Sequence, residues 1–261
     1  MTSIRVLGLA IAGWAAFASP SSSACLDTAS ACRIAGGSYH IAWPSGVPRD
    51  KEVPAVVVLH SYKGSGLGLI KSGKMVKTLL SRGYAVIAPE GINGNWQLNH
   101  GGRRDDVAFI RTVADDAAKR GSFARSRMML AGFSSGGSMV AYVACHSPGA
   151  FKAYAPVSGN FWKPEPKSCA GPVNYLHIHG SKDTTMPIAG RSVGSSLRQA
   201  SLLESMATLA RASGCDDADL KTATTRSWKG CNSSLRLVMH DGGHSVPRFW
   251  AGAALDWFEG L

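Results

Sequence analysis

Several short runs of apolar residues recur along the chain without alternating polar positions. Most are rich in β-branched or small apolar residues and lead into loops that carry glycine or charged residues. Continuous apolar runs of this length are typical of strands that are buried on both faces of a parallel sheet. We predict such strands over residues 54–60, 84–89, 127–133, 153–158, 173–179 and 235–240.

Segments with helical spacing of apolar residues lie between these runs. They cover residues 70–82, 105–120, 138–145, 196–213 and 247–259. Strands that alternate with helices along the chain predict an α/β fold, with a mostly parallel, doubly wound sheet and helices on both faces. Reactive groups gather at the carboxyl ends of the strands in such sheets. We therefore expect the functional side chains directly after the predicted strands.

Two serines stand in a Gly-x-Ser-x-Gly pattern. Ser134 directly follows the run over 127–133, and small residues follow it, so that a helix and a strand can pack closely there. This context holds a serine hydroxyl on a sharp strand-to-helix turn as a nucleophile. Ser192 has no strand leading into it and is interpreted as part of a loop before a helix. We predict Ser134 as the nucleophile.

A serine nucleophile needs a histidine that takes its proton and a carboxylate that fixes the tautomer of that histidine. In this architecture the order along the chain is serine, acid, histidine. His244 lies in a glycine-rich loop after the run over 235–240, and Asp183 follows the run over 173–179. We predict His244 as the base and Asp183 as the acid, with Asp241 as the rival carboxylate.

The tetrahedral intermediate of acyl transfer needs backbone N–H groups aimed at its developing negative charge. The amide of Ser135 is one candidate, because it begins the helix after the nucleophile, where the helix dipole helps. The second should come from the loop after the first predicted strand, where we choose Tyr62 and keep Ser61 as the alternative. His177 and His179 share one strand face, but no third ligand is evident, so we expect neither a metal nor a cofactor.

The first residues have the pattern of a signal peptide. Arg5 precedes an apolar stretch over 6–17, and small residues over 22–24 offer a cleavage site before Cys25. The apolar stretch is shorter than the roughly 20 residues that a membrane-spanning helix needs. We therefore predict a signal peptide over 1–24, a secreted (extracellular or periplasmic) protein, and one α/β catalytic domain over 25–261. Lipidation of Cys25 after cleavage is the alternative.

Six cysteines in an exported chain predict three disulfides. The pairing closest in sequence joins Cys25 to Cys32, Cys145 to Cys169 and Cys215 to Cys231, although many other pairings are possible. The net charge of +11 indicates a surface that attracts anions. The basic residues are scattered, with no arginine-rich stripe interleaved with aromatics, so we expect no nucleic acid partner, no stable membrane insertion and a monomer.

Five short motifs occur together in one order: HSYKGSG over 60–66, DDV over 105–107, GFSSGG over 132–137, HGSKD over 179–183 and GGHS over 242–245. From about residue 36 onward the chain resembles the secreted esterases grouped with polyhydroxybutyrate depolymerases and feruloyl esterases, which are α/β-hydrolases. The resemblance implies ester hydrolysis through an acyl-enzyme.

In that resemblance Ser134, Asp183 and His244 match the triad positions, and Tyr62 matches the residue whose amide completes the oxyanion hole. It also supports the pairs Cys145–Cys169 and Cys215–Cys231. One departure is Ser61, where such esterases usually have glycine, so that its side chain could shift the oxyanion loop.

The motifs do not specify the ester. Feruloyl or acetyl-type esters and hydroxyalkanoate oligomers are the expected substrates. Soluble esters or oligomers are favoured over crystalline polymer, because the chain has no room for an added polymer-binding domain. Tyr62, Trp96 and Trp162 fall in loops, where they either face the site or serve ordinary loop packing. A non-catalytic exported binding protein and a small serine peptidase are the alternatives to an esterase.

Overall fold

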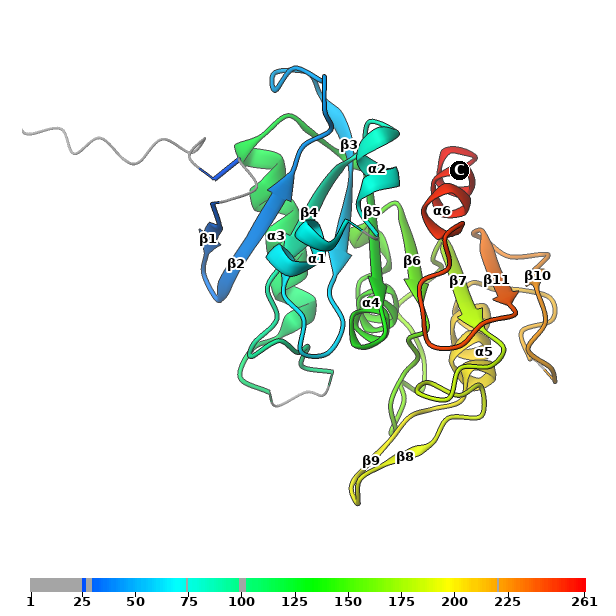
Figure 1. Ribbon diagram of the computed structural model, residues 1–261. Helices are drawn as coiled ribbons and strands as arrows, with labels where there is room; N and C mark the ends of the chain where they lie inside the picture. The colour runs from blue at the N-terminus through cyan, green and yellow to red at the C-terminus, as the bar shows by residue number, and fades with distance from the viewer. Residues whose placement is uncertain (1–24, 27–29, 74, 99–101, 220) are drawn as a thin grey trace, which may run out of the picture.

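The computed structural model describes residues 25–26, 30–73, 75–98, 102–219 and 221–261. The predicted signal peptide over residues 1–24 therefore lies outside the described residues. A mixed sheet of nine strands organises the described chain, in the order β1-β2-β4-β3-β5-β6-β7-β11-β10 (Figure 1). Its six central strands run parallel and confirm the predicted ones; they are β4 (Ala85–Pro89), β3 (Val53–Leu59), β5 (Phe123–Phe133), β6 (Ala153–Val157), β7 (Tyr175–Gly180) and β11 (Leu235–His240).

Antiparallel strands that were not predicted complete the sheet at both edges. One edge carries β1 (Cys32–Ile34) and β2 (Gly37–Ala42), and the other carries β10 (Arg226–Ser227). A separate hairpin joins β8 (Ser192–Val193) to β9 (Leu197–Arg198). Ser192 therefore lies in a short exposed strand, and the expectation of a loop before a helix is wrong at this residue.

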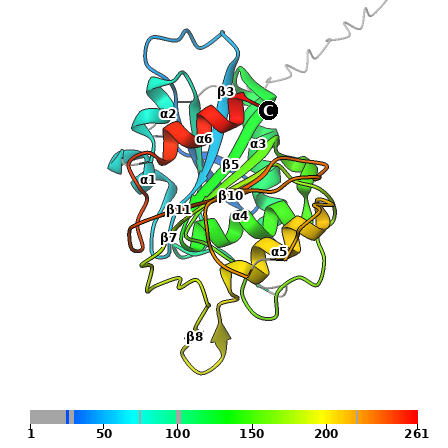
Figure 2. The ribbon, with the colours of Figure 1, turned by 90° about the vertical axis from the view of Figure 1, so that its right-hand side faces the viewer.

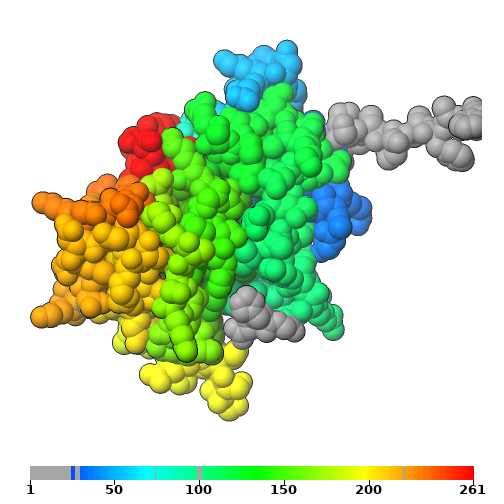
Figure 3. Space-filling view, turned by 180° about the vertical axis from the view of Figure 1, so that it is seen from behind, coloured from blue at the N-terminus to red at the C-terminus, as the bar shows by residue number. Residues whose placement is uncertain are grey.

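The central strands are continuously apolar because both of their faces are covered. Side chains alternate between the two faces of a strand, and in β3 the side chains of Val57 and Leu59 join one core while those of Val56 and Val58 join the other. Helices α1 (Gly66–Ser72), α2 (Lys77–Ser81) and α6 (Trp250–Glu259) cover the second core. Helices α3 (Asp106–Arg120), α4 (Ser135–His146) and α5 (Leu202–Ala212) cover the first (Figure 2). Figure 3 shows the molecule from behind, from the side covered by α3, α4 and α5, whose segments are green and yellow.

Two predicted helical segments differ from the observed helices more than the others do. The segment over 70–82 forms two helices, because Gly73 adopts a left-handed conformation with φ of 68° and ends α1. The segment over 196–213 becomes helical only at Leu202, where the side chains and backbone of Ser201 and Glu204 form a capping box. No helix in the described part of the chain has the length and apolar composition needed to cross a membrane.

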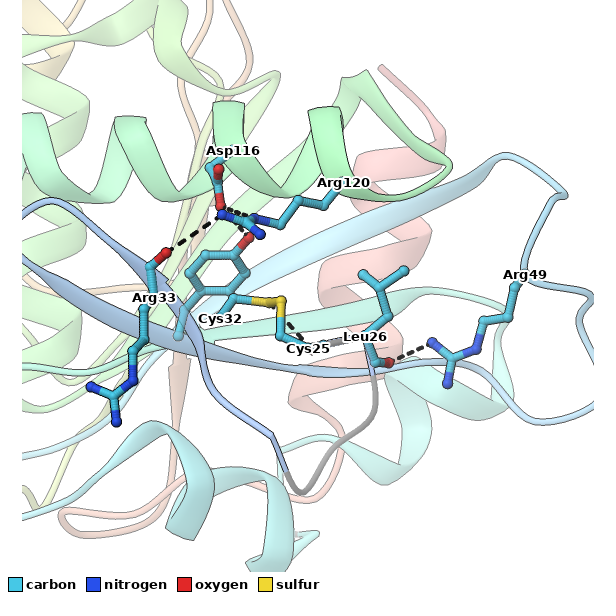
Figure 4. Close-up of a disulfide and its surroundings, with 8 residues drawn as sticks. Cys25, Leu26, Cys32, Arg33, Arg49, Asp116 and Arg120 are labelled. Carbon is cyan, nitrogen blue, oxygen red and sulfur yellow. Dashed lines mark hydrogen bonds and ion pairs between the residues drawn. A yellow bond between two sulfur atoms is a disulfide. The ribbon is translucent and has the colours of Figure 1, made fainter. Parts of the chain in front are cut away.

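The predicted disulfides Cys25–Cys32, Cys145–Cys169 and Cys215–Cys231 are all present. The sulfur of Cys25 is bonded to Cys32, which leaves no thiol there for a lipid. Around this disulfide, Arg49 donates to the carbonyl oxygen of Leu26, and Arg120 bridges Asp116 and the carbonyl oxygen of Arg33 (Figure 4). These contacts fasten the start of the described chain to α3 and to the edge of the sheet.

Candidate active site

Ser134 occupies a sharp turn between β5 and α4. Its φ of 57° and ψ of −120° lie in a region that costs a non-glycine residue about 1–3 kcal/mol. The backbone N–H of Ser134 donates to the carbonyl oxygen of Val157 at 3.0 Å and so anchors the turn to the end of β6. The surrounding fold thus maintains a strained serine at the carboxyl edge of the sheet, as the sequence pattern predicted.

The glycines after Ser134 allow this turn to lie against the neighbouring strands. A Cβ on Gly136 would meet the carbonyl oxygens of Leu59 and His60, the latter at 2.6 Å, and a Cβ on Gly137 would lie 2.7 Å from the carbonyl oxygen of Val157. These partners are backbone atoms at strand ends and cannot move aside cheaply. Helix α4 therefore begins at Ser135, three residues before the predicted start at residue 138.

Ser134, His244 and Asp183 form one chain of hydrogen bonds. The Nδ1 atom of His244 lies 2.8 Å from Oδ2 of Asp183, and its Nε2 atom lies 2.9 Å from Oγ of Ser134. Because a carboxylate only accepts, Nδ1 of His244 carries the proton and Nε2 is left to accept the serine hydroxyl proton. The structure therefore brings together the three residues predicted from the order along the chain.

Asp183 is buried, and its carboxylate accepts hydrogen bonds from backbone N–H groups. Oδ1 accepts hydrogen bonds from the amides of Thr185 at 2.9 Å and Met186 at 2.8 Å. Burial acts to raise the pKa of Asp183, but the hydrogen bonds from Met186 and His244 outweigh it, and the pKa lies below its ordinary value of 3.8. The rival carboxylate of Asp241 is exposed and pairs with Lys182 at 2.7 Å, away from this chain.

His177 and His179 support the turn that carries Asp183. Nε2 of His177 lies 3.0 Å from Nδ1 of His179, and Nε2 of His179 donates to the carbonyl oxygen of Met186 at 2.8 Å. Burial lowers the pKa of both histidines, so that they remain neutral. The sequence placed them on one strand face, but it gave no sign that they pack behind the acid turn.

The loop after β3 turns back on itself between Ser61 and Gly64. The amide of Gly64 donates to the carbonyl oxygen of Ser61 at 2.9 Å, and Lys63 takes the positive φ of 58° that closes such a turn. The side chain of Tyr62 is exposed. Within the described residues, the amides of Tyr62 and Ser135 donate to no other group, so both remain available to a ligand.

A cavity of about 660 Å³ opens beside His244. Its apolar lining comes from Leu69, Met75, Phe133 and Val246, and Lys63 lies at its wall. This volume is within the range of about 300–1,000 Å³ that is usual for small-molecule sites.

Of the loop aromatics, Trp96 does not face this cavity. It is 2 % exposed, and its indole N–H donates to the carbonyl oxygen of His60 at 2.8 Å, which favours the loop-packing interpretation for this residue. Trp162 is also tied to its surroundings, because its backbone N–H donates to the hydroxyl of Tyr142 and its indole N–H to Oγ of Ser138.

Comparison with known proteins identifies the family. A model of the dienelactone hydrolase family matches residues 42–201, which is more than half of the chain. The chain belongs to the dienelactone hydrolase family. Proteins that it resembles in sequence include "Feruloyl esterase C" of Emericella nidulans, 26 % identical over 239 residues that cover 85 % of this chain and 82 % of that protein. "Probable feruloyl esterase C" of Aspergillus clavatus is 27 % identical over 236 residues, covering 84 % and 80 % of the two chains.

Solved structures with the same fold superpose on this protein. The acetyl xylan esterase from Aspergillus awamori superposes with a TM-score of 0.63 at 17 % identity, over 87 % of this chain and 95 % of that one. A Bacillus cereus carboxylesterase gives a TM-score of 0.58 at 17 % identity with the same coverage. The predicted α/β-hydrolase fold and the resemblance to esterases are confirmed, and the protein is a carboxylic ester hydrolase.

Proposed function

We propose that the protein hydrolyses esters through an acyl-enzyme, with Ser134 as nucleophile, His244 as base and Asp183 as the residue that orients the histidine. The observation that carries this proposal is the hydrogen-bonded chain from Asp183 through His244 to a serine on a strained turn. Nε2 of His244 takes the proton as Oγ attacks the ester carbonyl carbon, and it later gives that proton to the leaving alcohol. Water then releases the acid by the same route.

In this mechanism the amides of Tyr62 and Ser135 donate to the oxyanion of the tetrahedral intermediate. The Ser135 amide belongs to the first turn of α4, where the positive end of the helix dipole stabilises an anion. The contact that a Cβ on Gly136 would make with the carbonyl oxygen of His60 shows how closely α4 approaches the Tyr62 loop. Preorganised donors of this kind are worth about 10²–10³ in kcat each.

We further propose that the acyl group is aromatic, of the feruloyl type. The support is the similarity to proteins named feruloyl esterase C and the cavity beside His244, whose lining is partly apolar and includes Phe133. A panel of methyl ferulate, acetylated xylan, short acyl esters and 3-hydroxybutyrate oligomers tests this. We expect the highest kcat/KM for methyl ferulate. Equal values on all four would instead indicate a broad carboxylesterase.

The triad assignment is tested by Ser134→Ala, with Ser192→Ala as the matched control. Both serines stand in a Gly-x-Ser-x-Gly pattern, but Ser192 is exposed on the β8–β9 hairpin. We expect Ser134→Ala to lower kcat on p-nitrophenyl acetate by about 10⁴-fold or more, and Ser192→Ala to leave it unchanged. Full turnover by Ser134→Ala would refute the proposed nucleophile.

We also propose that the protein is exported and acts as a monomeric catalytic domain over residues 25–261. Three disulfides support export, because disulfides persist in oxidising compartments. N-terminal sequencing of the protein recovered outside the cytoplasm should begin at Cys25, and size-exclusion chromatography should give one chain per particle. A cytoplasmic protein that retains residues 1–24 would contradict export.

A further inference from the structure

His60 is buried beneath the loop that carries Tyr62, and it is held on three sides. Its backbone carbonyl oxygen accepts the indole N–H of Trp96 at 2.8 Å, and the two rings pack with centroids 4.7 Å apart. Its Nε2 atom accepts the backbone N–H of Gly91 at 2.9 Å. Its Nδ1 atom lies 2.9 Å from the carbonyl oxygen of Ser61. The residue is 2 % exposed, although it also contributes to the wall of the cavity beside His244, so little water reaches these bonds.

These contacts permit one tautomer. Because Gly91 donates a proton to Nε2, that nitrogen carries none, and the ring proton must be on Nδ1. Nδ1 therefore donates to Ser61, whose carbonyl oxygen is an acceptor only. Burial lowers the pKa of His60, which maintains this neutral form.

The carbonyl oxygen of Ser61 thus receives two hydrogen bonds, one from His60 and one from the amide of Gly64. In a trans peptide unit the C=O and N–H groups point in opposite directions. Fixing the Ser61 carbonyl toward His60 and Gly64 therefore fixes the Tyr62 N–H on the opposite side. Two donors on the carbonyl also polarise the peptide, which strengthens its N–H as a donor.

We propose that His60 is a positioning residue: its Nδ1–H group holds the Ser61–Tyr62 peptide so that the Tyr62 N–H is aimed at the oxyanion. This inference rests on the proposed ester hydrolysis at Ser134. Nothing in the reaction requires His60 to exchange a proton. It acts on the rate through the geometry of one peptide group, and its neutral tautomer is set by Gly91, a residue 31 positions away in the chain.

Two substitutions separate the two nitrogen atoms of His60. In His60→Asn the side-chain amide N–H replaces the donor at the Nδ1 position, while the acceptor for Gly91 is lost. In His60→Gln the side-chain carbonyl replaces the acceptor at the Nε2 position, while the donor to Ser61 is lost. His40→Asn is the matched control, because His40 is also buried, at 7 % exposed, and lies on β2 beside Glu90.

The measurements are kcat and KM on p-nitrophenyl acetate, with the active-site concentration obtained by titration with diethyl 4-nitrophenyl phosphate. We expect His60→Gln to lower kcat per active site about 10–100-fold with KM within about threefold, because misaimed donors lose transition-state binding alone. His60→Asn should retain kcat within about threefold, and His40→Asn should match the wild type. Equal losses in His60→Asn and His60→Gln, or full kcat in His60→Gln, would overturn the proposal.

Gly64→Ala provides a second route if His60→Gln does not fold. A Cβ on Gly64 would lie 2.8 Å from the carbonyl oxygen of Ser61 and 3.3 Å from Nδ1 of His60, so it would crowd both partners of the hydrogen bond that holds the Ser61–Tyr62 peptide. We expect a kcat loss of about tenfold or more, and an unchanged kcat would overturn the proposal. Loss of activity in Ser134→Ala combined with full activity in His60→Gln would refute this inference alone. Full activity in Ser134→Ala would refute the proposed function itself.

Discussion

Replacing Gly136 with alanine tests the close packing of α4 against the end of β3. The added Cβ would lie 2.6 Å from the carbonyl oxygen of His60 and would also contact that of Leu59. Overpacking costs about 1–3 kcal/mol in general. Here both partners are backbone atoms at the end of a central strand, and Leu59 is paired with Gly132 in the parallel ladder. We therefore expect a cost of about 2–3 kcal/mol in the free energy of unfolding, near the upper end of that range.

For a chain of this size, about 2–3 kcal/mol corresponds to a fall in Tm of about 4–12 °C, measured by circular dichroism melting. The same strain moves the start of α4, with the amide of Ser135, away from the Tyr62 loop. A displacement approaching 1 Å costs up to about 10²-fold in rate, so kcat/KM on p-nitrophenyl acetate should fall about 10–100-fold.

Gly252 in α6 provides the matched control for this substitution. It is also a helical glycine, but a Cβ there would meet nothing within 4 Å. Alanine should therefore stabilise the protein by about 0.5–1 kcal/mol, through its helix propensity, and leave kcat/KM unchanged. A Gly136→Ala protein that melts within about 1 °C of the wild type with normal kcat/KM would refute the close-packing explanation.

Three further substitutions probe the acid, a disulfide and a helix start. Because the pKa of Asp183 lies below 3.8 in the folded protein, its contribution to the free energy of unfolding is complete above pH about 4 and is lost as the pH falls through the lowered value. The Tm difference between wild type and Asp183→Asn should therefore be constant between pH 5 and 6 and change below about pH 4; a difference that is constant down to pH 2 would contradict this. Serine at both Cys145 and Cys169 opens a loop with a sequence separation of 24, which should cost about 3 kcal/mol in chemical denaturation, and an unchanged denaturation midpoint would count against it. Ser201→Ala removes the capping box of α5 and should cost about 1 kcal/mol with no change in kcat/KM; a lower kcat/KM would show that α5 influences the site.

The central sheet could be predicted from the sequence because strands that are buried on both faces consist mostly of apolar residues. Strand β6, with the sequence AYAPV, is buried at every position. Strand β2, which lies next to the edge strand β1, carries Ser38 and His40 and is exposed where it begins, so its composition resembles that of a loop. Its pairing depends on partners distant in the chain, including the bond from the hydroxyl of Tyr39 to Asp116 on α3.

Capping residues mark both of the helix boundaries over 70–82 and 196–213 that differ from the prediction, but the apolar spacing concealed them. Gly73 stands directly after a turn that ends in Lys71 and Ser72, an arrangement typical of a helix end. Ser201 and Glu204 have the spacing of a capping box just before an apolar helix face. Apolar periodicity alone continues through both places, because some apolar residues lie on either side of each boundary. Helix boundaries depend on capping residues more than on periodicity.

The grouping of Ser134, Asp183 and His244 could be predicted because each follows a parallel strand, and parallel strands end at one edge of the sheet. The effect of a serine at position 61 on the loop that carries Tyr62 could not be predicted in the same way. Glycine is usual there in the esterases that the chain resembles, and the sequence alone indicates only that a side chain at this position could shift the loop. In the structure the positive φ of the turn belongs to Lys63, while Ser61 contributes only its carbonyl oxygen to the bonds from His60 and Gly64. Because no left-handed conformation is required of residue 61, a serine there is compatible with the same orientation of the Tyr62 amide.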